Sequence, residues 1–173
     1  MSHAHLPYFE GDPDHLRTMF ASCPSGVAAL LAEVDSVPVG IIASSLTVGV
    51  SIVPPLITCA IRNLSKTWPI LKRATRLGVT VMGEDQGPMA RQIASRTGDD
   101  RFTDIPLRSV GSDSLFIAGA PVWFECELKD EVPAGDHVIA FLEIKRGGAE
   151  ADDPPLIFYG SKFRQLKEIE EAV

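Results

Sequence analysis

Hydroxyl and basic side chains gather in two short segments that flank one apolar run of the chain. The first segment is marked by hydroxyl groups, on Ser44, Ser45, Thr47 and Ser51. The second is marked by groups that suit an anion, on Arg62, Ser65, Lys66 and Thr67. Hydroxyls can bind the polar edge of a flat ring, and basic residues at the start of a helix can bind a phosphate. Together the two segments would suit a ligand with a ring at one end and a phosphate at the other.

A structural role explains the second segment equally well when the segment is taken alone. Ser65 and Thr67 are residue types that cap helices, and Arg62 and Lys66 would then lie in water. By itself the segment favours this plainer interpretation, so a binding function needs support from the rest of the chain.

That support comes from a series of motifs in one order. Residues 43–67 read ASSLTVGVSIVPPLITCAIRNLSKT and resemble the flavin-contacting segment of the flavin reductase-like family, the FMN-binding split barrels. Further matches are CPSGVAAL at 23–30, EDQGPMARQIA at 84–94, DRF at 100–102, AGDH at 134–137 and PPLIFYGSKF at 154–163. They cover nearly the whole chain, which makes the resemblance more specific than any single motif. The sequence departs from the family pattern at Leu46, Gly49 and Ile52.

The resemblance implies a role for most of the matched positions. The ring and ribityl parts of a flavin would contact Ala43, Ser44, Ser45, Leu46, Thr47 and Ser51. The phosphate would be bound by Arg62, Ser65 and Thr67. Phe102 would wall the flavin edge, and Arg101 would order the same loop or meet the nicotinamide nucleotide. A surface arginine beside an anchoring aromatic ring explains the DRF motif equally well.

His137 is the candidate catalytic residue. It follows Gly135 and Asp136 in an expected turn, where a histidine is more often a hydrogen-bonded turn residue than a catalyst. The resemblance places the histidine of AGDH near the nicotinamide, so we expect a positioning group more than an acid or base. His3, His5 and His15 are expected to be exposed, and no metal site is predicted.

The resemblance also implies an activity, that of an FMN-dependent NAD(P)H:flavin oxidoreductase, with FAD as the alternative flavin. Hydride would pass from NADH or NADPH to the flavin, and reduced flavin would serve a partner such as a monooxygenase. Family members commonly form homodimers, so a homodimer is expected. The alternative function is a non-enzymatic flavin carrier or electron-transfer protein with tightly bound FMN. No G-x-G-x-x-G motif follows a strand, so a Rossmann nucleotide site is not predicted.

Length and composition restrict the class of protein independently. A chain of 173 residues fits a single domain over residues 1–173. The net charge of −7 argues against a nucleic-acid partner. Apolar runs are shorter than the roughly 20 residues that span a bilayer, and no signal peptide is evident, so we expect a cytoplasmic protein without membrane contact. Cys59 and Cys126 lie in apolar runs and are expected in the core.

Apolar spacing predicts a mainly β protein, an antiparallel split β-barrel with helices packed outside. A polar loop is expected at 44–51 and an irregular segment at 99–115. Strands are expected at 27–34, 38–44, 56–61, 78–82, 122–132, 137–147 and 154–159. Helices are expected at 12–22, from Trp68 to near Gly78, at 84–97 and at 162–172. Tyr159 is expected in the core.

Overall fold

The computed structural model describes residues 11–95, 100–149 and 153–167. Its helices are α1 (Pro13–Ala21), α2 (Trp68–Leu71) and α3 (Gly87–Ala94), with one 3-10 turn, η1 (Glu84–Gln86). Its strands are β1 (Ser25–Gly26), β2 (Ala28–Val34), β3 (Val37–Ala43), β4 (Leu46–Ile52), β5 (Pro55–Arg62), β6 (Leu77–Val81), β7 (Leu107–Ser109), β8 (Leu115–Ile117), β9 (Val122–Ala134), β10 (His137–Ala149), β11 (Ile157–Tyr159) and β12 (Lys162–Arg164). Among these residues no helix is long and apolar enough to cross a membrane.

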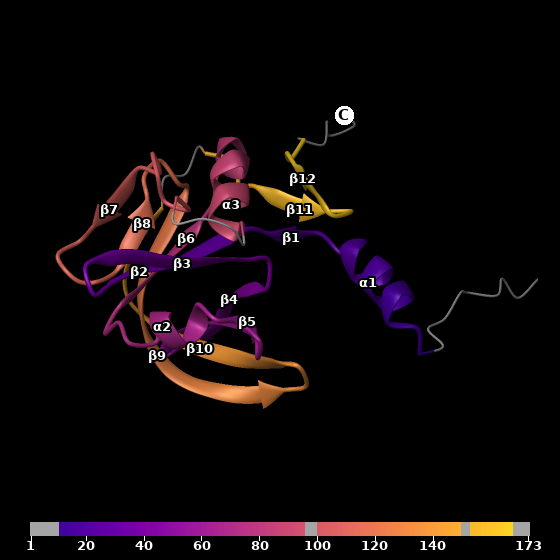
Figure 1. Cartoon of the computed structure of the whole chain (residues 1–173), viewed down its shortest axis with the longest axis horizontal. Helices are drawn as coiled ribbons and strands as arrows, with labels where there is room; N and C mark the ends of the chain where they lie inside the picture. Colours follow the sequence, from indigo (N-terminus) through magenta and orange to yellow (C-terminus); the bar gives the residue numbers. More distant parts are fainter. Residues whose placement is uncertain (1–10, 96–99, 150–152, 168–173) are drawn as a thin grey trace, which may run out of the picture.

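One curved antiparallel sheet carries the fold (Figure 1). Its seven strands lie in the order β3-β2-β6-β9-β10-β5-β4. Within the described residues the two edge strands, β3 and β4, are not hydrogen-bonded to each other, so the sheet does not close. Two small sheets, β1-β11-β12 and β7-β8, lie beside it. The predicted mainly β, antiparallel open barrel with flanking helices is confirmed.

Strand β2 contributes to two hydrophobic cores because its two faces are both covered. Leu30, Ala32 and Val34 belong to the core on the inner side of the sheet. Ala29 and Leu31 belong to a second core, which includes Ala90 and Ile93 of α3. Side chains alternate between the faces of a strand, and this double burial explains why β2 is almost wholly apolar. The sheet therefore has a hydrophobic core on its α3 side as well as on its inner side.

Helix α1 begins where the sequence predicts but packs little. The Asp12 carboxylate accepts a hydrogen bond from the main-chain N of Asp14 at 3.0 Å, and Pro13 is the first helical residue. No residue of α1 is buried, and Met19 and Phe20 are 42% and 66% exposed. Figure 1 shows α1 standing away from the sheet. A nine-residue helix has little stability on its own, so this apolar surface stands without a partner in the described structure.

The expected polar loop at 44–51 is wrong, because most of it is strand. Strand β4 pairs with β5, and Gly49, with φ of +71°, lies in an irregularity between Thr47 and Ser51. Val48, Val50 and Ile52 alternate along it, which is typical of a strand. The hydroxyls of Thr47 and Ser51 therefore lie on an edge strand, and only Ser44 and Ser45 remain in a connection, the one between β3 and β4.

Four other predictions need correction. Helix α2 ends at Leu71, and Gly78 lies inside β6. Residues 107–109 of the expected irregular segment at 99–115 form β7, and its last residue, Leu115, begins β8. The expected C-terminal helix is wrong where it is described, because Lys162–Arg164 form β12, and Tyr159 is 44% exposed rather than buried. Outside the described residues lie His3, His5, residues 96–97 of the expected helix at 84–97 and residues 168–172 of the expected C-terminal helix.

Candidate functional site

A pocket of about 910 Å³ lies where the end of β3, the end of β5, the start of β10 and the end of α3 meet. Its lining includes eight of the predicted site residues, namely Ala43, Ser44, Ser45, Arg62, Ser65, Thr67, Arg101 and His137. The other lining residues are Ile41, Ile42, Ala60, Ile61, Leu64, Lys66, Ala94 and Ser95. Sheet pairing thus brings together residues that are far apart in the sequence.

The connection from β3 to β4 is fixed to β5 by Ser45. Its Oγ donates to the main-chain O of Ala60 at 2.9 Å and lies 3.5 Å from Sγ of Cys59. Burial raises the pKa of the Cys59 thiol, and its hydrogen bond with Ser45 offsets this rise only in part. Cys59 is thus a protonated core residue, as expected, and not a nucleophile. The Ser45 hydroxyl keeps its lone pairs, with which it can accept a hydrogen bond from a ligand.

The segment after β5 is held by both a cap and a buried indole. Ser65 Oγ accepts a hydrogen bond from the main-chain N of Trp68 at 3.1 Å, whereas Thr67 makes no side-chain cap. Trp68 Nε1 donates to Glu131 Oε1 at 2.7 Å, and Lys72 donates to the other carboxylate oxygen of Glu131. The capping interpretation of Ser65 is therefore correct. Its hydroxyl hydrogen is not used by the cap and can still be donated into the pocket.

His137 lies in the pocket with one ring nitrogen engaged. Its Nδ1 is 2.7 Å from Oδ1 of Asp136, and hydrogen bonding to His137 lowers the pKa of that exposed carboxyl. Asn63 supports the preceding turn, since its side chain donates to Gly135 O at 3.2 Å and its main-chain N donates to Asp136 O at 3.0 Å. Nε2 is therefore the ring nitrogen left for a ligand.

Arg101 ties two walls of the pocket together. Its Nε donates to the main-chain O of Ile93 at 2.8 Å, and its Nη2 donates to the main-chain O of Gly40 at 2.9 Å. Partial burial lowers the pKa of the guanidinium. Phe102 packs against the α3-side core, and a Cβ on Gly40 would lie 3.2 Å from its ring. Arg101 therefore orders this part of the chain, which is one of the two roles that the resemblance implied for it, and Phe102 is an anchoring aromatic ring. A contact of either residue with a nucleotide stays a prediction.

Four predicted site residues do not line this pocket. Leu46 packs against the inner core, Phe102 packs against the other core, and Thr47 is exposed on β4. Ser51 lies opposite Leu56, near the far end of β4. A contact between any of these four and a flavin stays a prediction.

The pocket is positively charged although the chain as a whole is negatively charged. Arg62, Lys66 and Arg101 line it, and no Asp or Glu occurs among the described residues that do so. The chain as a whole has a net charge of −7. The volume falls within the range of about 300–1,000 Å³ that small-molecule and cofactor sites occupy. The arrangement suits an anionic ligand with a flat apolar part, which is what a flavin nucleotide is.

Sequence reasoning missed the apolar wall and the α3 end of the pocket. Ile41, Ile42, Ala60 and Ile61 give no signal because apolar strand residues look alike whether they face a core or a ligand. Ser95 does carry a signal, as a polar residue directly after the motif at 84–94. Among the described residues, no group of three or more His, Cys, Asp or Glu side chains could hold a metal ion.

A family match covers most of the chain. The flavin reductase like domain matches residues 20–167. The chain therefore belongs to the flavin reductase-like family, and the resemblance inferred from its motifs is confirmed.

Two sequence relatives and one solved structure illustrate the similarity. An NADH:FMN oxidoreductase of Rhodococcus qingshengii is 32% identical over 145 residues, 81% of this chain and 74% of that protein. The reductase subunit of a flavin-dependent monooxygenase of Rhodococcus jostii is 27% identical over 156 residues, 90% of this chain and 79% of that protein. An NADH:FAD oxidoreductase of Streptomyces globisporus has a TM-score of 0.84 and 27% identity, covering 94% of this chain and 100% of that chain.

Proposed function

We propose that this chain is an NAD(P)H:flavin oxidoreductase that reduces FMN or FAD. One observation supports this most directly: a pocket lined by three cationic side chains, without a carboxylate among its described lining residues, in a strongly acidic chain. Because the chain belongs to the flavin reductase-like family, a flavin nucleotide is the anion that we expect in this pocket. One relative and the structural neighbour are named as oxidoreductases and the other relative as a reductase subunit, which favours an enzyme over a flavin carrier.

Two sets of residues would share the binding of the flavin. Arg62 and Lys66 supply positive charge for its phosphate, and the free hydrogen of the Ser65 hydroxyl supplies a donor. Ser44 and the lone pairs of Ser45 offer polar contacts to a ring edge. The apolar side chains of the pocket would cover the ring and remove it from water.

A bound flavin supplies the chemistry by accepting a hydride from the reduced nicotinamide. The protein needs no acid, base or nucleophile for this step. Its residues bind the two nucleotides, orient them and exclude water. His137 would act on the nicotinamide nucleotide through Nε2, because Asp136 holds Nδ1 and so fixes the orientation of the ring. This makes His137 a positioning group.

The names of similar proteins support a choice of flavin and of nicotinamide nucleotide. One relative is an NADH:FMN oxidoreductase, and the structural neighbour is an NADH:FAD oxidoreductase. We propose NADH as the preferred reductant and FMN as the first flavin to test. Reduced flavin would pass to a separate monooxygenase, because one relative is the reductase subunit of such a system.

The exposed apolar surface supports a homodimer. Met19 and Phe20 of α1 are exposed, as are Ile52 and Val53 at the β4–β5 turn, which are 80% and 89% exposed. Monomers seldom expose such side chains in groups. A second copy of the chain, packed on these surfaces, would cover them and would give α1 the tertiary contacts that it lacks.

An absorbance assay tests the proposal. Purified protein is mixed with NADH or NADPH, first alone and then with excess FMN, FAD or riboflavin, and the nicotinamide absorbance band is followed. We expect catalytic loss of the band that depends on added flavin. A protein that binds flavin but oxidises neither nucleotide would contradict the reductase and support a carrier.

A further inference from the structure

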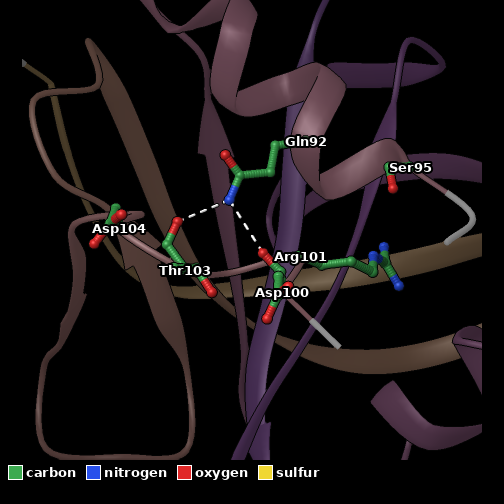
Figure 2. A pocket seen from close by; sticks show the side chains of 6 residues that line it. All are labelled: Gln92, Ser95, Asp100, Arg101, Thr103 and Asp104. Atoms are coloured by element: carbon green, nitrogen blue, oxygen red, sulfur yellow. Dashed lines mark hydrogen bonds between the residues drawn. The ribbon is translucent and has the colours of Figure 1, made fainter. Parts of the chain in front are cut away.

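A glutamine of α3 holds the turn that carries Arg101. Nε2 of Gln92 lies 2.7 Å from the main-chain O of Thr103 and 3.2 Å from the main-chain O of Asp100 (Figure 2). An amide nitrogen carries two hydrogens, so Gln92 can donate one to each carbonyl. Within the turn, Thr103 N also donates to Asp100 O at 3.1 Å. One side chain thus fixes residues 100–104 against the helix.

The turn at 100–104 positions Arg101 so that its guanidinium donates hydrogen bonds to two main-chain carbonyls. One belongs to Ile93, in the last turn of α3, and the other to Gly40, in β3. The next residues along these two elements, Ala94 with Ser95 and residues 41–43, line the 910 Å³ pocket. The guanidinium therefore links these two walls through hydrogen bonds, in addition to the core contacts between α3 and the sheet.

Gln92 itself does not line that pocket. It lines a smaller hollow of about 410 Å³, which shares Ser95 and Arg101 with the larger one. Figure 2 shows Gln92 on the helix reaching the turn, with the Arg101 side chain extending away from it. Any effect of Gln92 on a ligand in the larger pocket must pass through the turn and Arg101.

We propose that Gln92 is a positioning residue for the flavin site, which it shapes through the turn at 100–104 and Arg101. This inference rests on the function proposed above. The two carbonyls need a group with two donors, and at this position only an amide supplies both at the length observed. Without it Thr103 O loses its hydrogen bond from Gln92, the turn loosens, and the wall that Arg101 holds loosens with it.

Two substitutions separate the hydrogen bonds from the shape of the side chain. Gln92→Met keeps the length and removes the donors. Gln92→Glu keeps the shape and, when ionised, turns a carboxylate oxygen toward two carbonyl oxygens, which repel it. We expect the dissociation constant for FMN to rise about threefold in the first variant and about tenfold in the second.

The readout is the FMN dissociation constant from fluorescence titration, together with KM for flavin and kcat. A merely structural role would lower the folded fraction but leave the affinity of the folded protein unchanged. A positioning role raises the dissociation constant and KM, with kcat at saturating flavin nearly unchanged. Arg91→Ala is the matched control, because Arg91 contacts the Phe163 ring, with 5.0 Å to its centroid, and not the turn. We expect that control to stay within about twofold of the wild type.

The outcomes separate this inference from the proposed function. If the wild type binds flavin and both variants bind it equally well, Gln92 has no positioning role. If Gln92→Glu fails to fold, Gln92→Met decides the question. If the wild type binds neither FMN nor FAD, the proposed function is wrong and the inference falls with it.

Discussion

His137, the first residue of β10, lies in register with Arg62, the last residue of β5. Directly opposed residues of antiparallel strands have Cβ atoms about 4.5–5.5 Å apart. Both side chains line the same pocket, and the Asp136 carboxylate is hydrogen-bonded to His137, while the charge of Arg62 also helps to lower the pKa of that carboxyl. Strand pairing thus sets a cation beside an imidazole that Asp136 orients. The proposed function assigns Arg62 to the phosphate of the flavin and His137 to the nicotinamide nucleotide.

Arg62→Ala should weaken the binding of FMN far more than that of riboflavin. FMN carries a phosphate and riboflavin does not, so only FMN loses a charge-assisted hydrogen bond worth about 2 kcal/mol, or roughly thirtyfold in affinity. Fluorescence titration with both flavins measures the difference. Arg73→Ala is the control, because Arg73 pairs with Asp35 and does not line the pocket. Equal losses for both flavins would show that Arg62 does not bind the phosphate.

His137→Ala should affect the use of NADH but not the binding of FMN. We expect KM for NADH to rise about tenfold, while the dissociation constant for FMN changes little, because His137 is assigned to the second nucleotide. Steady-state kinetics at saturating FMN, with a separate FMN titration, test this. Asp136→Asn removes the charged partner of Nδ1 and should give a smaller change in the same direction. A drop in FMN affinity with unchanged KM for NADH would reverse the assignment.

The sequence predicted well where neighbouring residues decide the structure. The hairpin of β2 and β3 is one case, since strands were expected at 27–34 and 38–44 with only a short connection between them. Asp35 and Ser36 in that connection both have positive φ, 53° and 62°, as a two-residue hairpin turn requires. The start of α1 is another, since Asp12 and Pro13 act within the helix itself. Residues 43–67, whose motif carried the family resemblance, also supplied most of the pocket residues that could be predicted.

Prediction from the sequence failed where a segment far away along the chain determines the local structure or contact. Nothing in the sequence indicated that the Ser45 hydroxyl donates a hydrogen bond to the main-chain O of Ala60 in β5. Gly78 has the appearance of a helix end, yet its place is set by the close approach of Leu115. Arg101 and Gln92 are similar, because their partners are main-chain carbonyls, which every residue possesses and no pattern reveals.

Gly78→Ala should destabilise the protein strongly. A Cβ at Gly78 would lie 1.9 Å from the main-chain O of Leu115, and neither backbone can yield cheaply. We expect the free energy of unfolding to fall by about 3 kcal/mol, which urea unfolding would measure. Gly26→Ala is the control, since no heavy atom lies within 4 Å of the added Cβ, and it should change stability by less than about 0.5 kcal/mol. Equal stability of the two variants would contradict the close contact.

Glu125→Gln should destabilise the protein in a pH-dependent way. Glu125 is 1% exposed, and hydrogen bonds from Arg146, with further ones from Ser112 and Ser114, lower its pKa despite burial. A lowered folded pKa means that the ionised carboxylate stabilises the fold above its unfolded pKa of about 4.3, and that this contribution is lost as the pH falls through the folded pKa.

At pH 7 the variant should therefore lose about 2 kcal/mol of unfolding free energy, and the difference should shrink below about pH 4. Urea unfolding over a pH series measures it. Asp85→Asn is the control, because Asp85 is exposed and its side chain has no hydrogen bond or ion pair within the described residues. A difference that is constant with pH would show that the charge of Glu125 is not what stabilises the fold.

Phe20→Glu should convert the proposed homodimer into a monomer. Phe20 is 66% exposed on a helix without a buried residue, so burying its ring would require a second copy, and a carboxylate there would have to be desolvated. Size-exclusion chromatography with light scattering would report the mass. Thr18→Glu adds the same charge on the opposite side of α1, away from Leu16 and Met19, and should leave the dimer intact. A wild type that is monomeric at all concentrations, or a Phe20→Glu variant that stays dimeric, would exclude α1 from the interface.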